Sequence, residues 1–120
     1  IYRLTEFLHE ENFSKGVDVN CLAPGAVKTG ITEQAHAAGQ SLGPLYQSTQ
    51  KILDQGGDSP ELAARATALL LSESCDRLSG RLISAKWDGD YLAHPRKVID
   101  DADLLRLRRI DEALFVKKSR

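Results

Sequence analysis

One short segment carries the residue types whose spacing suits ligand binding. It begins with four apolar residues, three of them at alternate positions, which predicts a buried or half-buried strand: Val17, Val19, Cys21 and Leu22. The strand ends at Pro24, whose φ is fixed and which has no amide hydrogen, and Gly25 can turn sharply or let a ligand approach its backbone. Thr29 adds a compact hydroxyl. An open α/β sheet presents its ligand site in this way, at the carboxyl end of a strand.

The whole pattern of residues 17–29, Val-x-Val-Asn-x-x-x-Pro-Gly-x-Val-x-Thr, resembles the segment after the sixth strand of the short-chain dehydrogenases/reductases (SDRs). In that family the segment lies against the nicotinamide of NAD or NADP. The resemblance implies that Pro24, Gly25 and Ala26 line the ring. It also implies that the main chain of Val27 and the hydroxyl of Thr29 bind the carboxamide or the diphosphate. The competing interpretation is an ordinary strand and turn.

Residues 1–13 have helical spacing, with Leu4, Phe7 and Leu8 on an apolar side. This segment is similar to the SDR helix that follows the catalytic Tyr-x-x-x-Lys, which implies that the catalytic Ser, Tyr and Lys all lie upstream of Ile1. Neither Tyr2 nor Tyr46 has a lysine four residues later, and the glycine-rich fingerprint that holds a pyrophosphate is absent from the sequence. We therefore expect no catalytic residue in these 120 residues and no activity from them alone.

Residues 30–58 are rich in glycine and predict an irregular loop, with a short helix over Leu45–Leu53. A loop this long is usually a lid or a binding segment. In the SDR family the equivalent insert closes over the substrate, so His36 and Tyr46 are candidate substrate contacts. The simpler interpretation is that both are surface residues of a mobile loop.

Ser59-Pro60-Glu61 predicts the start of a helix, with a serine N-cap, proline at the first helical position and an acid in the first turn. Residues 81–85 then predict a short strand. This order is similar to the last helix and the last strand of SDRs, which commonly build the subunit interface. The resemblance therefore implies a homo-oligomer.

The alternation of helix and strand over residues 1–90 predicts an α/β fold with a parallel sheet. With the resemblance, we interpret it as the C-terminal portion of a Rossmann-like, doubly wound sheet. Only two strands are evident, and parallel strands need both faces covered, so the sheet should be incomplete on its own. We expect the missing N-terminal half as another chain, or a second copy of this chain over the open edge.

Residues 91–120 predict a C-terminal extension with an acidic helix start at residues 100–103. Its apolar stripe comprises Leu104, Leu107, Ile110 and Leu114. Eight basic residues in this tail are interleaved with five acidic ones, and no stacking aromatics or nucleic-acid motif accompany them. We expect a helix docked on the protein body and no nucleic-acid partner.

The composition is that of a soluble globular protein, with a formal net charge of −1. There is no apolar run long enough for a membrane span and no visible signal peptide, so a cytoplasmic protein without a membrane partner is expected. Cys21 and Cys75 lie far apart in sequence, which argues against a metal site.

These observations predict part of an NAD(P)-dependent oxidoreductase that transfers a hydride between nicotinamide and a small alcohol or carbonyl substrate. One alternative is a non-catalytic dimerisation or assembly fragment of an SDR-like fold. Another is a sugar epimerase or dehydratase of the related extended family, which the short Pro-Gly-x-Val-x-Thr stretch disfavours.

Overall fold

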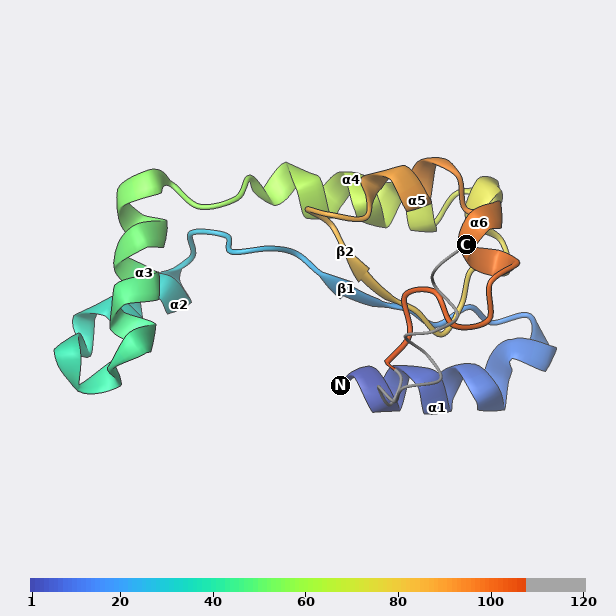
Figure 1. Cartoon of the computed structure of the whole chain (residues 1–120), viewed down its shortest axis with the longest axis horizontal. Coiled ribbons are helices and arrows are strands. Elements are labelled where there is room, and N and C mark those ends of the chain that lie inside the picture. The colour runs from blue at the N-terminus through green and yellow to red at the C-terminus, as the bar shows by residue number, and fades with distance from the viewer. Residues whose placement is uncertain (108–120) are drawn as a thin grey trace, which may run out of the picture.

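The computed structural model describes residues 1–107, which form helices around one small sheet (Figure 1). The elements in chain order are α1 (Tyr2–Asn12), β1 (Cys21–Ala23), α2 (Gly30–Ala37), α3 (Pro44–Gln55), α4 (Pro60–Leu70), β2 (Leu82–Ser84), α5 (Gly89–Ala93) and α6 (Arg96–Ile99). Short 3₁₀ turns occupy Phe13–Lys15, Gly39–Leu42 and Glu73–Cys75.

The two strands run parallel, with Leu22 opposite Ile83 at the centre of the pair. Parallel strands need a long crossover between them, and α2, α3 and α4 all lie in that crossover. The predicted α/β class with a parallel strand pair is confirmed. Within residues 1–107 the sheet contains only these two strands.

The core lies on one side of the sheet. In Figure 1, α4 and α5 lie on one side of the strands and α1 on the other. Ile83 and Val98 are fully buried, and Leu78 is nearly so. The remaining buried apolar residues all come from the segments after residue 60: Ala66, Cys75 and Leu92. Burying side chains of this size is the main favourable contribution to folding.

Helix α1 buries a different face from the one that its sequence predicts, and of the expected apolar residues only Leu8 is half-buried. Leu4 is 55% exposed and Phe7 59%, whereas Thr5 and His9 are buried. His9 meets the turn before β2, where its Nδ1 lies 2.9 Å from Oγ of Ser79. A buried polar contact thus orients this helix, and Leu4 and Phe7 remain exposed.

The first strand is shorter than predicted, because residues 17–20 make side-chain contacts where a longer strand would continue the ladder. The side chain of Asn20 donates to the carbonyl of Leu78 and accepts from the amide of Arg81. The amide of Gly80 donates to the carbonyl of Val19. These bonds satisfy polar groups of the chain before β1, and regular pairing begins at Cys21.

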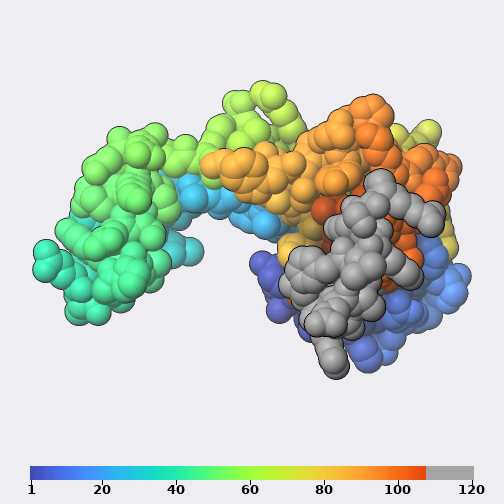
Figure 2. Space-filling view, in the orientation of Figure 1, coloured from blue at the N-terminus to red at the C-terminus, as the bar shows by residue number. Residues whose placement is uncertain are grey.

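The segment 30–58 is a helical hairpin, so the prediction of an irregular loop was wrong. Helices α2 and α3 pack together and form a lobe that extends from the body (Figure 2). The glycines responsible for the prediction lie at helix ends: Gly43 precedes Pro44 at the first position of α3, and Gly56 ends α3 in the left-handed conformation. The short helix expected over Leu45–Leu53 lies within the observed α3, so this part of the prediction for the segment is confirmed.

The start of α4 is as predicted. The hydroxyl of Ser59 accepts a hydrogen bond from the amide of Glu61 at 3.3 Å, and Pro60 takes the first helical position. The far end of the helix leaves Leu69 and Leu71 exposed, at 40% and 83%.

The helix expected to start at residues 100–103 does not form there. The carboxylate of Asp101 accepts from the amides of Asp103 and Leu104, which makes a local turn, and Leu105 has a positive φ of 57°. Arg81 fastens this turn, because its guanidinium donates to the carbonyls of Val98 and Leu104. Ile110 and Leu114 lie outside the described residues.

Candidate functional site

The predicted ligand turn lies directly after β1. Pro24, Gly25, Ala26 and Thr29 are exposed and Val27 is half-buried. Because β1 and β2 are parallel, the chain that leaves β2 emerges at the same edge, and the amide of Ala85 donates to the carbonyl of Ala23. The five residues therefore lie at the carboxyl end of the strands, as the sequence predicts.

Gly25 is required by its backbone conformation and by its neighbour. Its φ is +93°, in the region that favours glycine. A Cβ atom at this position would lie 2.8 Å from Oδ2 of Asp58, which is too close for the two atoms to coexist without movement. The carboxylate of Asp58 therefore packs directly on the open face of the glycine.

Asp58 binds both the turn and Lys86, the second residue after β2. Its Oδ2 accepts from the amide of Ala26 at 2.9 Å, and its own amide donates to the carbonyl of Ala26 at 3.0 Å. Its Oδ1 accepts from Nζ of Lys86 at 2.6 Å. The hydrogen bond from Lys86, followed by that from Ala26, lowers the pKa of the Asp58 carboxyl below its ordinary value. Both bonds favour the ionised form of the Asp58 carboxyl.

A second close approach lies next to the first. Val27 and Gly57 form an isolated antiparallel bridge. Gly57 has a φ of +66°, and a Cβ atom there would lie 2.5 Å from the carbonyl oxygen of Ala26. Beside this bridge is an open hollow of about 220 Å³, lined by Ala26, Lys51, Ile52, Gln55, Gly57, Asp58 and Lys86. The turn therefore forms one wall of a pocket whose other walls include α3.

The hydroxyl of Thr29 also has a structural role. Thr29 is the N-cap of α2 and forms a capping box with Thr32, in which its side chain accepts from the Thr32 amide. A hydroxyl has one donor and two acceptor sites, so this bond leaves capacity for a second partner. The hydroxyl oxygens of Thr29 and Thr32 lie 3.4 Å apart. The Thr32 hydroxyl donates to the carbonyl of Val27.

The two candidate substrate contacts, His36 and Tyr46, lie on α2 and α3 and contact each other. Their rings are stacked, with centroids 4.7 Å apart and an interplanar angle of 15°. Both are half-buried. The stack packs α2 against α3, and this structural role is enough to explain why both aromatic side chains are present.

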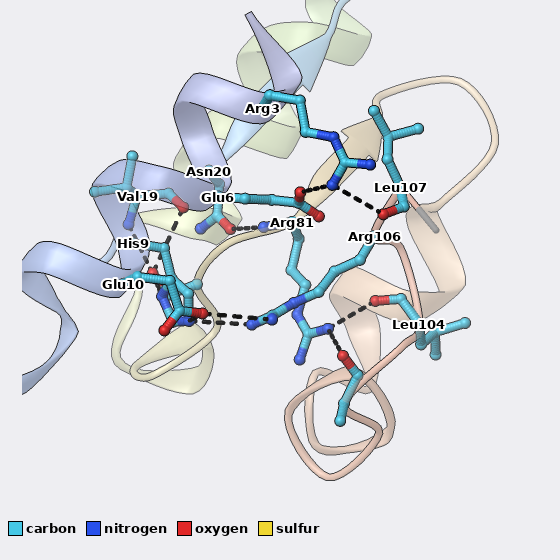
Figure 3. Close-up of polar contacts among 12 residues, drawn as sticks. Arg3, Glu6, His9, Glu10, Val19, Asn20, Arg81, Leu104, Arg106 and Leu107 are labelled. Carbon is cyan, nitrogen blue, oxygen red and sulfur yellow. Dashed lines mark hydrogen bonds and ion pairs between the residues drawn. The ribbon is translucent and has the colours of Figure 1, made fainter. Parts of the chain in front are cut away.

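A polar cluster that sequence reasoning missed joins α1 to the turn before β2 and to the segment after α6 (Figure 3). Nε2 of His9 lies 3.0 Å from Nη2 of Arg106, and Nδ1 lies 2.9 Å from Oγ of Ser79. The same oxygen accepts from the amide of Val19 at 2.8 Å. Gly80 permits this packing, since a Cβ atom there would lie 2.7 Å from the His9 ring. The residues are far apart in sequence, so no local pattern signals the cluster.

The pair Ser79–His9 is not arranged as a nucleophile and its base. Arginine can only donate, so Nε2 of His9 accepts from Arg106, and in the neutral ring Nδ1 then carries the hydrogen and donates to Ser79. A base must accept the proton of its serine, and this nitrogen cannot. Ser79 is also only 3% exposed. The cluster is therefore structural.

Asp58 and Lys86 are the site residues that sequence reasoning missed. The only sequence signal for Asp58 is an acid after Gly56-Gly57, which is typical of any turn. Lys86 follows the second strand, but nothing local in the sequence pairs it with Asp58. Within residues 1–107, no group of His, Cys, Asp or Glu side chains is placed to hold a metal ion, and no helix has the length and apolarity to cross a membrane.

Comparison of the chain with protein-family models, curated proteins and solved structures found no match.

The first prediction compares two glycines with similar backbone conformations. Gly16 has a φ of +79° and open space where a Cβ would lie, whereas Gly25 meets Asp58. Gly16→Ala should lower the free energy of unfolding by about 1 kcal/mol through left-handed strain alone, and Gly25→Ala by about 2 kcal/mol or more because the collision adds to it. Urea denaturation measures both. When it is measured in an Asp58→Ala background, the cost of Gly25→Ala should be closer to that of Gly16→Ala. Equal losses in the two single variants would contradict the close contact.

The second prediction concerns pH and His9. Burial, followed by the charge of Arg106, lowers the pKa of His9 below 6.5, with Arg81 adding to this and Glu10 and Asp18 opposing it. Below pH 6.5 the unfolded chain therefore takes up a proton that the folded chain resists. The stabilisation is fully present above pH 6.5 and decreases as the pH falls toward the lowered pKa.

Urea denaturation between pH 7.5 and 5 (about the range in which histidine titrates) should show this decrease. His9→Gln should remove much of the pH dependence. The control His94→Gln changes a histidine whose side chain is 59% exposed, and it should leave the pH dependence in place. The same slope in His9→Gln as in the unmodified protein would rule out this role for the histidine.

Proposed function

We propose that this chain is the C-terminal portion of an NAD(P)-dependent short-chain dehydrogenase/reductase with a Rossmann-like fold. The enzyme transfers a hydride between nicotinamide and a small alcohol or carbonyl substrate. The observation that carries the proposal is the exposed turn Pro24–Thr29 at the carboxyl end of a parallel strand, with Gly25 at a φ of +93°. Open α/β sheets bind ligands at this edge.

The residues of the turn fit one side of a cofactor site. Pro24, Gly25 and Ala26 are exposed and form a wall for the nicotinamide, whose role in the reaction is to accept or donate the hydride. Both main-chain polar groups of Ala26 are bound to Asp58, so this residue would contact the ring by packing. The main chain of Val27 and the hydroxyl of Thr29 would bind the carboxamide or the diphosphate.

The acid-base chemistry falls to residues upstream of Ile1. In this proposal an upstream tyrosine donates or accepts the proton, a lysine lowers the pKa of that tyrosine, and a serine orients the substrate carbonyl. A tyrosine has an ordinary pKa near 10 and works as a general acid or base only when this value is shifted toward neutrality. The α2–α3 hairpin would lie over the substrate, with His36 and Tyr46 as candidate contacts.

Two exposed apolar surfaces support further polypeptide around this chain. The α1 side exposes Leu4 and Phe7, and the end of α4 exposes Leu69 and Leu71. Apolar surfaces of this kind mark contact sites for other protein surfaces. We assign the α1 side to the missing half of the sheet, and α4 with β2 to the interface of a homo-oligomer. The same exposure favours the second candidate function, a non-catalytic assembly module.

Experiments on the natural polypeptide that contains these residues distinguish the enzyme from the assembly module. The enzyme proposal expects Tyr-x-x-x-Lys just before Ile1, in the same chain or in a co-purifying one, and oxidation of NADH or NADPH with small carbonyl compounds, followed by absorbance. Intact-mass spectrometry of the purified material and its N-terminal sequence test the first point. Absence of the motif together with no binding of either reduced cofactor would favour the assembly module.

The role of Thr29 can be separated from its structural role. Thr29→Val in the natural polypeptide should weaken binding of the reduced cofactor by roughly 1 kcal/mol or more, because a hydrogen bond is lost, whereas Thr29→Ser should retain it. Fluorescence titration with NADH and NADPH measures the affinity. Thr32→Val is the matched control, since it removes the other side chain of the capping box and leaves the Thr29 hydroxyl. Equal losses in Thr29→Val and Thr32→Val would attribute the effect to the start of α2.

A further inference from the structure

Asp58 connects its own segment with two others that are far apart in sequence. It lies between the turn at Gly56-Gly57 and the N-cap of α4. Its carboxylate accepts from the amide of Ala26, after β1, and from the ammonium of Lys86, after β2. One side chain therefore connects the carboxyl ends of both strands with the start of the last long helix.

The contact with Ala26 fixes the backbone in two directions. The Ala26 amide donates to the Asp58 side chain, and the Ala26 carbonyl accepts from the Asp58 amide. A peptide rotation on either side of Ala26 would break one of these bonds. The absence of a side chain at Gly25 lets the carboxylate approach, since a Cβ atom there would lie 2.8 Å from Oδ2. The turn conformation and the carboxylate position thus depend on each other.

Lys86 in turn holds the carboxylate. Nζ of Lys86 lies 2.6 Å from Oδ1, and the side chain of Asp58 is only 14% exposed. The remaining oxygen, Oδ2, is therefore directed at the Ala26 amide, and a hydrogen bond to an ionised acceptor is stronger than one between neutral groups. Ala26, Asp58 and Lys86 also line the same hollow of about 220 Å³.

We propose that Asp58 is a positioning residue for the cofactor: it holds Gly25 and Ala26 in the conformation that receives the nicotinamide. This inference rests on the proposed function. Asp58 acts through the main chain of Ala26, with which it forms two hydrogen bonds. Lys86 supports it by fixing the carboxylate and thereby contributes to cofactor affinity.

The test uses Asp58→Ala and Asp58→Asn in the natural polypeptide, with Asp54→Asn as the matched control. Asp54 lies near the end of α3 and accepts from Gln50 at 2.7 Å, and it is not among the residues that line the hollow. The readouts are the dissociation constants of NADH and NADPH and the hydrogen exchange of the Ala26 amide. Asp58→Ala should weaken cofactor binding by about tenfold, as expected for the loss of a hydrogen bond to a charged group, and accelerate exchange at Ala26.

The asparagine variant distinguishes positioning of the turn from a simple ion pair. Both Asp58→Asn and Asp58→Ala remove the salt bridge with Lys86, but the single amide oxygen of asparagine accepts from Ala26 when its NH2 group is turned toward Lys86, where two donors then meet. We therefore expect Asp58→Asn to restore part of the affinity and of the exchange protection that Asp58→Ala loses. Equal affinity losses in the two variants would leave only an ion-pair role and overturn the proposal, as would unchanged affinity in a folded Asp58→Ala protein.

Failure of the proposed function gives a different result. An unmodified protein that binds neither NADH nor NADPH overturns the cofactor assignment, and with it the positioning of a nicotinamide. Hydrogen exchange then still decides whether Asp58 holds the turn. Faster exchange of the Ala26 amide in Asp58→Ala than in Asp54→Asn supports the conclusion that Asp58 holds the turn, and equal exchange in the two variants contradicts it.

Discussion

The parallel pairing of β1 with β2 is the constraint on which the rest of the fold depends. Because the two strands run in the same direction, the chain must cross from the carboxyl end of one to the amino end of the other, and the crossover contains α2, α3 and α4. The same pairing brings the residues that follow both strands to the same end of the sheet. Asp58 lies in the crossover between α3 and α4, and it contacts Ala26 after β1 and Lys86 after β2.

The two sides of the sheet are stabilised by different kinds of interaction. On the α4 side, Ile83 and Val98 are fully buried in an apolar core. On the α1 side, contacts are largely polar, with His9 bonded to Ser79 and Arg106. Buried polar groups contribute little net free energy when they are paired and cost much when they are not, so this side specifies geometry more than it adds stability.

The sequence predicted the features that local chemistry determines. The N-cap at Ser59 and the turn after β1 follow from propensities and capping residues within a few positions, and the parallel strand pair follows from the order of helices and strands along the chain. Features that depend on distant partners were not predictable. The buried face of α1 is set by Ser79, and Asp101 forms a turn where an acidic helix start was expected. The glycines of residues 30–58 suggested a loop, because a glycine that ends a helix and one that interrupts it look alike in sequence.

The turn after β1 is shaped next to a sheet that has two strands within residues 1–107. Parallel strands need cover on both faces, yet Leu4 and Phe7 of α1 stay exposed, as does Leu71 beyond α4. The turn does not depend on cover of those exposed side chains, since Asp58, Gly57 and the main chain of Ala26 hold it through contacts made within this chain. Under the proposed function, the cofactor wall is therefore formed here, and the apolar surfaces remain for the polypeptide that supplies the catalytic residues.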